Sequence, residues 1–129
     1  LQTIADIRQP SQQVITVVGC GGNRDAAKRP VMAEIACKRS DLVFLTSDNP
    51  RFEEPEVILT DMSAGVAITD RPRVQTVVDR HAAIVQAVAA ARPGDIVLVA
   101  GKGHETYQEI KGVKHPFDDK QVLAEAFSV

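Results

Sequence analysis

The sequence predicts an α/β domain built on a doubly wound, mainly parallel sheet flanked by helices. Four short apolar runs, rich in Val, Ile and Leu, alternate with segments of ten or more residues that have helical periodicity. This alternation is typical of right-handed βαβ units. The length of 129 residues suits one domain with one compact core.

The first half of the chain begins with a β-branched run at 14–18, which predicts a buried strand. A glycine-rich stretch at 19–22 ends it, and Pro30 suits the first turn of a helix that runs to about Lys38. The residues expected to form the apolar face of this helix are Val31, Met32, Ile35 and Ala36. A second strand is expected at 42–45, followed by a loop at 46–52.

A second helix is expected to start at the acidic and proline-containing segment 53–56, because acids favour a helix N-terminus. Its predicted buried stripe consists of Ile58, Met62 and Val66. A third strand follows at 74–78, and Asp79 is a candidate cap for the next helix. That helix should carry Ile84, Val85 and Val88 along one face, and the segment 92–94 should end it.

The last part of the chain predicts a fourth strand at 96–99 and then a hairpin. The hairpin pairs 107–110 with the strand that starts at Val113, with Lys111 and Gly112 in the turn. A final helix is expected, and the side of it that faces the core should consist of Val122, Leu123, Ala126 and Phe127.

Composition excludes several classes of protein. The formal net charge is −2 and the basic residues are scattered, so nucleic acid is a poor partner. No apolar run approaches the roughly 20 residues of a membrane helix, and residues 1–13 lack a signal-peptide pattern. Cys20 and Cys37 have no metal-site or disulfide spacing, so we expect reduced thiols in a cytoplasmic protein. The absence of an initiator Met and the linker-like residues 10–13 suggest a domain of a longer protein.

Polar loops follow three of the predicted strands. They are GCGGNRD at 19–25, SDNPR at 47–51 and AGKGHE at 100–105. In open α/β sheets, ligands bind beyond the carboxyl ends of the strands, where loops and helix N-termini converge. We therefore expect these loops to open on one edge and to form the functional site.

Several common motifs are absent from these loops. A dinucleotide fingerprint would need a glycine where Arg24 stands, and a Walker A loop fails because Gly103 follows Lys102. The glycines at 19–22 are also explained by a tight turn alone. The histidines lack ligand spacing, so no metal site is expected. No nucleophile motif occurs, and Cys20 is a conceivable nucleophile without an evident base. No catalytic residue is assigned.

The residue types in the three loops suit an amino acid as ligand. Asp48 and Asn49 favour a turn, and Pro50 fixes the backbone before Arg51. A guanidinium held still offers a planar fork of donors that matches a carboxylate. Arg24 would add a second cation, and Glu105 an anion for an ammonium group. A zwitterion fits this set of charges, although a lone loop arginine is more often a solvated charge.

The segments GCGGNRDAAKRP, TSDNPR and VLVAGKGHE resemble the C-terminal domain of the Mur ligases, and most closely the members that add diaminopimelate. The resemblance runs from about Val14 to the end of the chain. It implies a Rossmann-like fold at 14–129, with 1–13 as a linker from a central domain missing here. The missing N-terminal and central domains would hold the UDP-sugar and the ATP P-loop.

The family resemblance also implies roles for particular residues. The side of the site that binds meso-diaminopimelate would comprise Arg24, Asp48, Asn49, Pro50, Arg51, Gly101 and Glu105. Asp25 and Lys28 would face ATP. In this family, ATP and Mg²⁺ activate the carboxylate of UDP-MurNAc-L-Ala-D-Glu as an acyl phosphate, and the incoming amine forms an amide in peptidoglycan biosynthesis. This chain lacks the P-loop and the magnesium ligands, so alone it is expected to be inactive.

Two other functions remain open. One is a lysine-adding or folylpolyglutamate-type ligase, which the intact DNPR loop disfavours because L-lysine lacks a carboxylate for Arg51. The other is a stand-alone nucleotide-binding or regulatory module. Activity of the full-length protein with each amino acid would separate the ligases, and calorimetry with NAD, ATP and diaminopimelate would identify the module.

Overall fold

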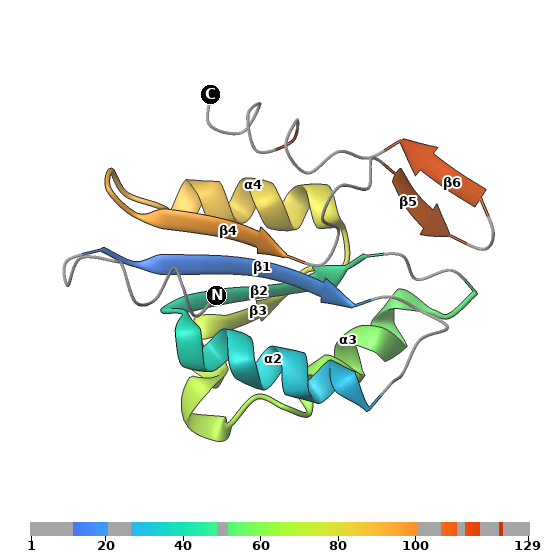
Figure 1. The fold of residues 1–129 in the computed structure, drawn as a ribbon, viewed down its shortest axis with the longest axis horizontal. Helices are drawn as coiled ribbons and strands as arrows, with labels where there is room; N and C mark the ends of the chain where they lie inside the picture. Colours follow the sequence, from blue (N-terminus) through green and yellow to red (C-terminus); the bar gives the residue numbers. More distant parts are fainter. Residues whose placement is uncertain are drawn as a thin grey trace.

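The computed structural model describes residues 12–20, 27–48 and 52–100, the backbone of 107–110 and 113–116, and Val122. Its main sheet has four strands in the order β3-β2-β1-β4, and all neighbouring pairs are parallel (Figure 1). The strands are β1 (Val14–Cys20), β2 (Leu42–Ser47), β3 (Val74–Thr76) and β4 (Ile96–Ala100). The predicted parallel α/β sheet is confirmed.

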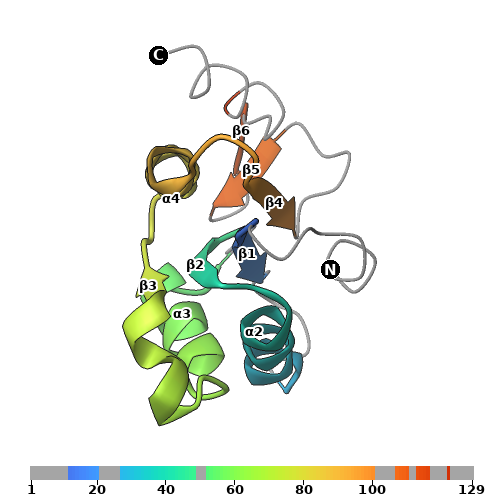
Figure 2. The same ribbon diagram turned by 90° about the vertical axis from the view of Figure 1, so that its left-hand side faces the viewer.

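Helices cover both faces of this sheet (Figure 2). One face carries α2 (Lys28–Arg39), α3 (Pro55–Ser63) and the 3-10 helix η1 (Ile68–Arg73), and the other carries α4 (Arg80–Ala90). The chain adds strands in one direction from β1 to β3 and then returns to place β4 on the other side of β1. A right-handed crossover in the reversed direction puts α4 on the opposite face. The direction changes between β1 and β4, which is where open sheets of this kind bind ligands.

The strands from which the three polar loops start end at the same edge of the sheet. Cys20 at the end of β1 is aligned with Ser47 at the end of β2, and Val18 is aligned with Ala100 at the end of β4. The prediction that the loops start together is confirmed for these strand ends.

The hydrophobic core has one layer on each face of the sheet. On the α2 and α3 face, Val18, Val43 and Leu45 pack with residues of both helices, and on the α4 face Ile15, Val17 and Phe44 pack with Ala83, Ile84 and Ala87. Both central strands are therefore buried on both sides, as expected for a parallel sheet. The predicted stripe of Ile58, Met62 and Val66 is confirmed as buried, although Val66 lies beyond the end of α3.

Two strand ends differ from the predictions. Both β1 and β2 continue two residues further than the apolar runs, so Thr46 and Ser47 belong to the sheet and not to a loop. Their hydroxyl groups donate hydrogen bonds to the Val78 carbonyl at 3.4 and 2.8 Å, which allows polar side chains to be buried there. The third strand, in contrast, ends at Thr76 and does not reach Val78.

The predicted apolar face of α2 is largely wrong. Val31 and Ile35 are 50% and 47% exposed, and Met32 is 36% exposed, while Ala36 is buried as expected. The helix instead turns Ala33, Ala36 and Cys37 toward the sheet. Small side chains let the helix axis approach the strands closely. The spacing of apolar residues along the helix did not by itself show which of two overlapping stripes, the predicted one or this one, would face the sheet. Val85 of α4 is likewise 41% exposed.

The remaining elements agree with the predictions as far as they are described. The strands β5 (Tyr107–Ile110) and β6 (Val113–Pro116) form the expected antiparallel pair, while their turn, Lys111 and Gly112, lies outside the described residues. Val122 is helical and buried, and the other predicted residues of the last helix lie outside the described part. Asp79 occupies the cap position of α4, but its side chain makes no capping hydrogen bond.

Within the described ranges, no helix combines the length and the apolarity that a membrane span requires.

Candidate functional site

The carboxyl edge of the sheet is the candidate site, and the structure describes its base. Two residues predicted for the site belong to the described part: Asp48 and Lys28. The others lie outside the described residues; they are Arg24, Asp25, Asn49, Pro50, Arg51, Gly101 and Glu105. The strand ends, the first residue of the DNPR segment and the two adjoining helix N-termini are therefore what the structure defines.

Asp48 directly follows β2 and is buried, with 7% of its surface exposed. Its backbone nitrogen lies 3.0 Å from the point that a Cβ on Gly19 would occupy, so the neighbouring strand approaches it closely. A tight turn was one of the explanations that the sequence left open for Gly19. The structure places Gly19 inside β1, where a side chain would collide with β2 and with the Arg80 guanidinium.

Arg80 is a fully buried arginine at the base of this edge. It is the first residue of α4, and one guanidinium nitrogen donates to the Ser47 carbonyl at 3.0 Å while the other donates to the Ala100 carbonyl at 3.4 Å. Ser47 ends β2 and Ala100 ends β4, on either side of β1. One side chain therefore connects the ends of two strands across the change in chain direction.

A second buried arginine, Arg29, lies in the first turn of α2. It donates one hydrogen bond to Glu53 and one to Asp61 of α3, each at 2.8 Å. Burial by itself would lower the pKa of the guanidinium, but the hydrogen bonds and negative charges of Glu53 and Asp61 raise the pKa above its usual value. Arg29 is thus a permanent cation that holds the chain just after the DNPR segment.

Cys20 is not equipped to act as a nucleophile. Burial raises the pKa of the Cys20 thiol to about 11, against a smaller lowering by Arg29, and the negative charge of Asp48 adds to the rise. The thiol is therefore neutral near pH 7, and the neutral thiol is a poor nucleophile. Its Sγ instead contacts Sδ of Met32 at 3.5 Å. The same effects show that Arg29 and Asp48 lie near the end of β1.

The sequence predictions missed Arg29 and Arg80, although a signal for both was present. A cation in the first turn opposes the helix dipole, and neither α2 nor α4 has an acidic residue there to offset it. An arginine in that position therefore indicates a specific partner. Lys28, the first residue of α2, is exposed and therefore accessible from solvent.

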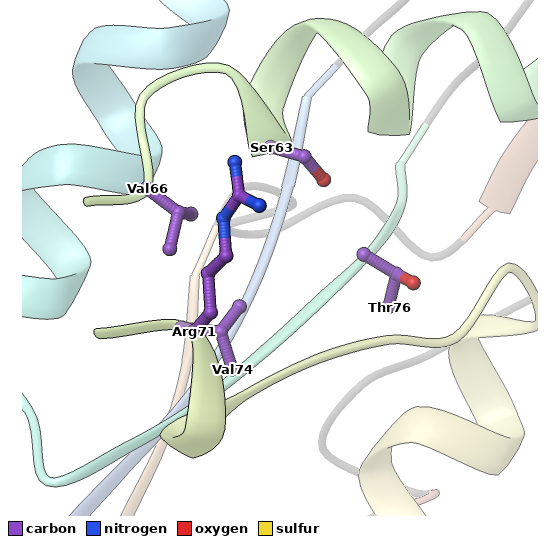
Figure 3. A pocket seen from close by; sticks show the side chains of 5 residues that line it. All are labelled: Ser63, Val66, Arg71, Val74 and Thr76. Carbon is purple, nitrogen blue, oxygen red and sulfur yellow. The ribbon is translucent and has the colours of Figure 1, made fainter. Parts of the chain in front are cut away.

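A separate cavity of about 260 Å³ lies at the edge strand β3 (Figure 3). It is lined by Ser63, Val66, Arg71, Val74 and Thr76, and the Arg71 side chain extends into it from η1. Of the predicted site residues, the structure describes Asp48 and Lys28, and neither of these lines this cavity. It also lies away from the change in chain direction, so we assign the site to the carboxyl edge.

Among the described residues, no group of three acidic, histidine or cysteine side chains is placed to hold a metal ion. The carboxyl edge does provide two buried guanidinium groups and a buried aspartate. Arg29 is bound by Glu53 and Asp61, and Arg80 donates to the carbonyl groups of Ser47 and Ala100, so both guanidinium groups stabilise the base of this edge.

Comparisons with a family model, with curated proteins and with solved structures all point to one family. The family model described as "Mur ligase, glutamate ligase domain" matches residues 1–103. A UDP-N-acetylmuramoyl-L-alanyl-D-glutamate–2,6-diaminopimelate ligase of Cytophaga hutchinsonii is 63% identical over 125 residues, which is 97% of this chain and 26% of that protein. The ligase of the same name from Bacteroides thetaiotaomicron is 56% identical over 128 residues, covering 99% of this chain and 27% of its own length.

A solved structure of a ligase with this name superposes with a TM-score of 0.90 at 44% identity. The match covers 98% of this chain and 26% of the solved chain. This chain therefore spans about a quarter of the length of these relatives.

Proposed function

Since the chain belongs to the Mur ligase family through its glutamate ligase domain, we propose that it is the C-terminal domain of an ATP-dependent ligase. This ligase adds meso-diaminopimelate to UDP-MurNAc-L-Ala-D-Glu in peptidoglycan biosynthesis. The observation that carries the proposal is the 63% identity, over almost the whole chain, to a protein named as a diaminopimelate ligase. The parallel strand ends at one edge agree with it.

The proposed domain begins at Val14, where β1 starts, and extends to residue 129. Residues 1–13 would link it to a central domain, which in turn would follow an N-terminal domain that holds the UDP-sugar. The short share of each relative that the chain covers supports this arrangement. Both cysteines are free thiols, which agrees with a cytoplasmic location.

The proposed ligand contacts follow from charge. Arg24 and Arg51 would bind carboxylate groups of meso-diaminopimelate, and Glu105 an ammonium group, with Asp48, Asn49, Pro50 and Gly101 shaping the site. The alignment of Cys20 with Ser47 and of Val18 with Ala100 supports this grouping, because all three segments start from neighbouring strand ends. The buried Asp48 supplies a negative charge at the same edge.

The role of this domain in the reaction would be to orient the attacking amine. ATP and Mg²⁺ supply the activation of the dipeptide carboxylate, and we propose that they bind mainly to the missing central domain, with Asp25 and Lys28 facing them from this side. Exposed Lys28 is available for such a contact. Holding two reactants in a productive geometry can lower a barrier by about 7 to 11 kcal/mol for ideally placed groups.

The proposal is tested with the full-length protein and an Arg51→Ala variant. Removing one charge-assisted contact should raise the KM for meso-diaminopimelate by about 10- to 100-fold, since such bonds contribute about 1.5–3 kcal/mol. The KM for ATP should stay within about 2-fold. Initial rates at varied concentrations of each substrate provide both values.

Arg71→Ala is the matched control, because Arg71 is an exposed arginine of η1 away from the proposed site. It should leave both KM values unchanged. A wild-type protein that used L-lysine as well as meso-diaminopimelate would contradict the proposed substrate. An Arg51→Ala variant with an unaltered KM for meso-diaminopimelate would contradict the role of Arg51 alone.

A further inference from the structure

Arg80 is the largest side chain of the described part that is completely buried. Its guanidinium lies over Gly19, within 2.8 Å of the point that a Cβ there would occupy, and reaches the carbonyl groups that end β2 and β4. These two carbonyl groups belong to the residues immediately before Asp48 and Gly101. Both segments that the proposed function assigns to ligand recognition therefore start at an atom bound to Arg80.

We propose that Arg80 is a positioning residue for the amino-acid site, because it fixes where the segments after β2 and β4 leave the sheet. The inference rests on the proposed function for the identity of the ligand. None of the Arg80 side chain is exposed, and it donates to the backbone of Ser47 and Ala100, so we assign it an action on the two strand ends.

The chemistry of the guanidinium suits this role. Its planar fork fixes the direction of two donors at once, so the two bound carbonyl groups are held in one relative position. Lysine would offer a single ammonium on a flexible stem, and methionine would fill the volume without any donor. Burial of a cation in the first turn of α4 is unfavourable unless such partners offset it.

A second connection fixes the same strand end. Ser47 Oγ donates to the Val78 carbonyl at 2.8 Å, and the Val77 nitrogen donates to the Leu45 carbonyl at 2.9 Å. The chain that leads into α4 is thus attached to β2, and Arg80 returns from α4 to the same strand. The position of Arg80 is therefore determined relative to β2 before any ligand binds.

Arg80→Met and Arg80→Lys in the full-length protein test the inference by kinetics. A small displacement of reacting groups can cost about 100-fold in rate, so we expect the KM for meso-diaminopimelate to rise about 10- to 100-fold in Arg80→Met. The KM values for ATP and for the UDP-linked dipeptide substrate should change by less than about 3-fold. Arg80→Lys, which keeps one donor, should give an intermediate value.

Arg73→Met is the matched control, because Arg73 also donates to two backbone carbonyl groups but at the opposite edge of the sheet. Its backbone partners are Ser40 and Cys37, the latter at 2.8 Å, and it also forms an ion pair with Asp70 at 2.7 Å. We expect a loss of thermal stability without a selective rise in the KM for meso-diaminopimelate. Equal KM changes in Arg73→Met and Arg80→Met would show that Arg80 contributes only stability, and would overturn the inference.

Gly19→Ala provides a second variant if Arg80→Met does not fold. The added methyl would lie 2.8 Å from the guanidinium and 3.0 Å from backbone atoms of Ser47 and Asp48, so it would disturb the same contact, and the same selective rise in KM is expected in a smaller degree. An unchanged KM in a folded Gly19→Ala protein with a displaced guanidinium would contradict the inference.

Hydrogen exchange separates failure of this inference from failure of the proposed function, because it needs no substrate. In Arg80→Met, peptides that contain residues 47–53 and 100–106 should exchange faster than in the wild type, and in Arg73→Met they should not. If the wild type does not use meso-diaminopimelate, the proposed function fails while the exchange result still decides whether Arg80 holds the two segments. Unchanged exchange in both regions overturns the inference whatever the substrate.

Discussion

The two edges of the parallel sheet are held by side chains of opposite charge. At the amino edge, Asp41 accepts a hydrogen bond from the Val14 nitrogen at 2.8 Å, and Asp95 accepts one from the Gln13 nitrogen at 3.0 Å. At the carboxyl edge, Arg80 donates to the carbonyl groups of Ser47 and Ala100. Carboxylates thus bind N–H groups where β1 enters the sheet, and a guanidinium binds C=O groups where β2 and β4 leave it.

The two edges also differ in how deeply their charged side chains are buried. Asp41 and Asp95 are partly exposed residues of turns that directly precede β2 and β4. Arg80 is completely buried and Arg29 almost so, and each reaches its partners from a helix N-terminus. Buried hydrogen bonds to a charged group lose more when they are broken than exposed ones. The carboxyl edge should therefore tolerate substitution least, which three predictions test.

The largest effect on stability is expected for Arg29→Met. This change removes the hydrogen bonds to Glu53 and Asp61 and leaves their carboxylates facing each other without the cation. We expect the free energy of unfolding to fall by about 1.5–3 kcal/mol, the range for hydrogen bonds to charged groups. Urea unfolding followed by circular dichroism measures it, with Arg71→Met as the exposed arginine control. If Arg29→Met lowered the free energy of unfolding no more than Arg71→Met does, the expected difference between the two edges of the sheet would be contradicted.

A smaller, pH-dependent effect is expected for Cys20. The unfolded thiol ionises near its ordinary pKa of 9.0, whereas the folded thiol has a pKa of about 11. Its contribution to stability is therefore complete below about pH 9 and declines as the pH rises toward 11. Urea midpoints of wild type and Cys20→Ala should differ most at pH 8 and converge as the pH approaches 11. Parallel profiles over this range would show that the thiol is not buried as described.

The smallest effect is expected for Asp95→Asn at the amino edge. Hydrogen bonds from the backbone nitrogens of Gln13 and Arg92 hold the pKa of Asp95 below its ordinary value of 3.8. The folded state is thus favoured above that pH, and the advantage is lost as the pH falls through the lowered pKa. The melting temperature of the variant should lie slightly below that of wild type at pH 7 and converge with it near pH 2. A loss at pH 7 larger than that of Arg29→Met would reverse the comparison.

The sequence predicted the fold well because its elements depend on local patterns. The apolar runs identified all four strands of the sheet, and the order of helices and strands along the chain was correct up to β6, except that the 3-10 helix η1 was not predicted. Strand ends were less accurate, since Thr46 and Ser47 look like loop residues until their hydroxyl groups find the Val78 carbonyl. For the candidate site, the sequence predicted that three polar segments follow strands that end at one edge, which the aligned strand ends confirm, but it did not indicate the arginines that hold the base of this edge.

The sequence by itself determined the alternation of strands and helices, the parallel sheet and the three polar segments after β1, β2 and β4. Each of these features follows from the pattern of neighbouring residues along the chain. Only the tertiary structure decided which side of α2 meets the sheet, and that Arg80 is buried. The reason is distance along the chain: the carbonyl partners of Arg80 lie 33 and 20 residues away, so a first-turn arginine can indicate that a partner exists, but no local pattern identifies that partner.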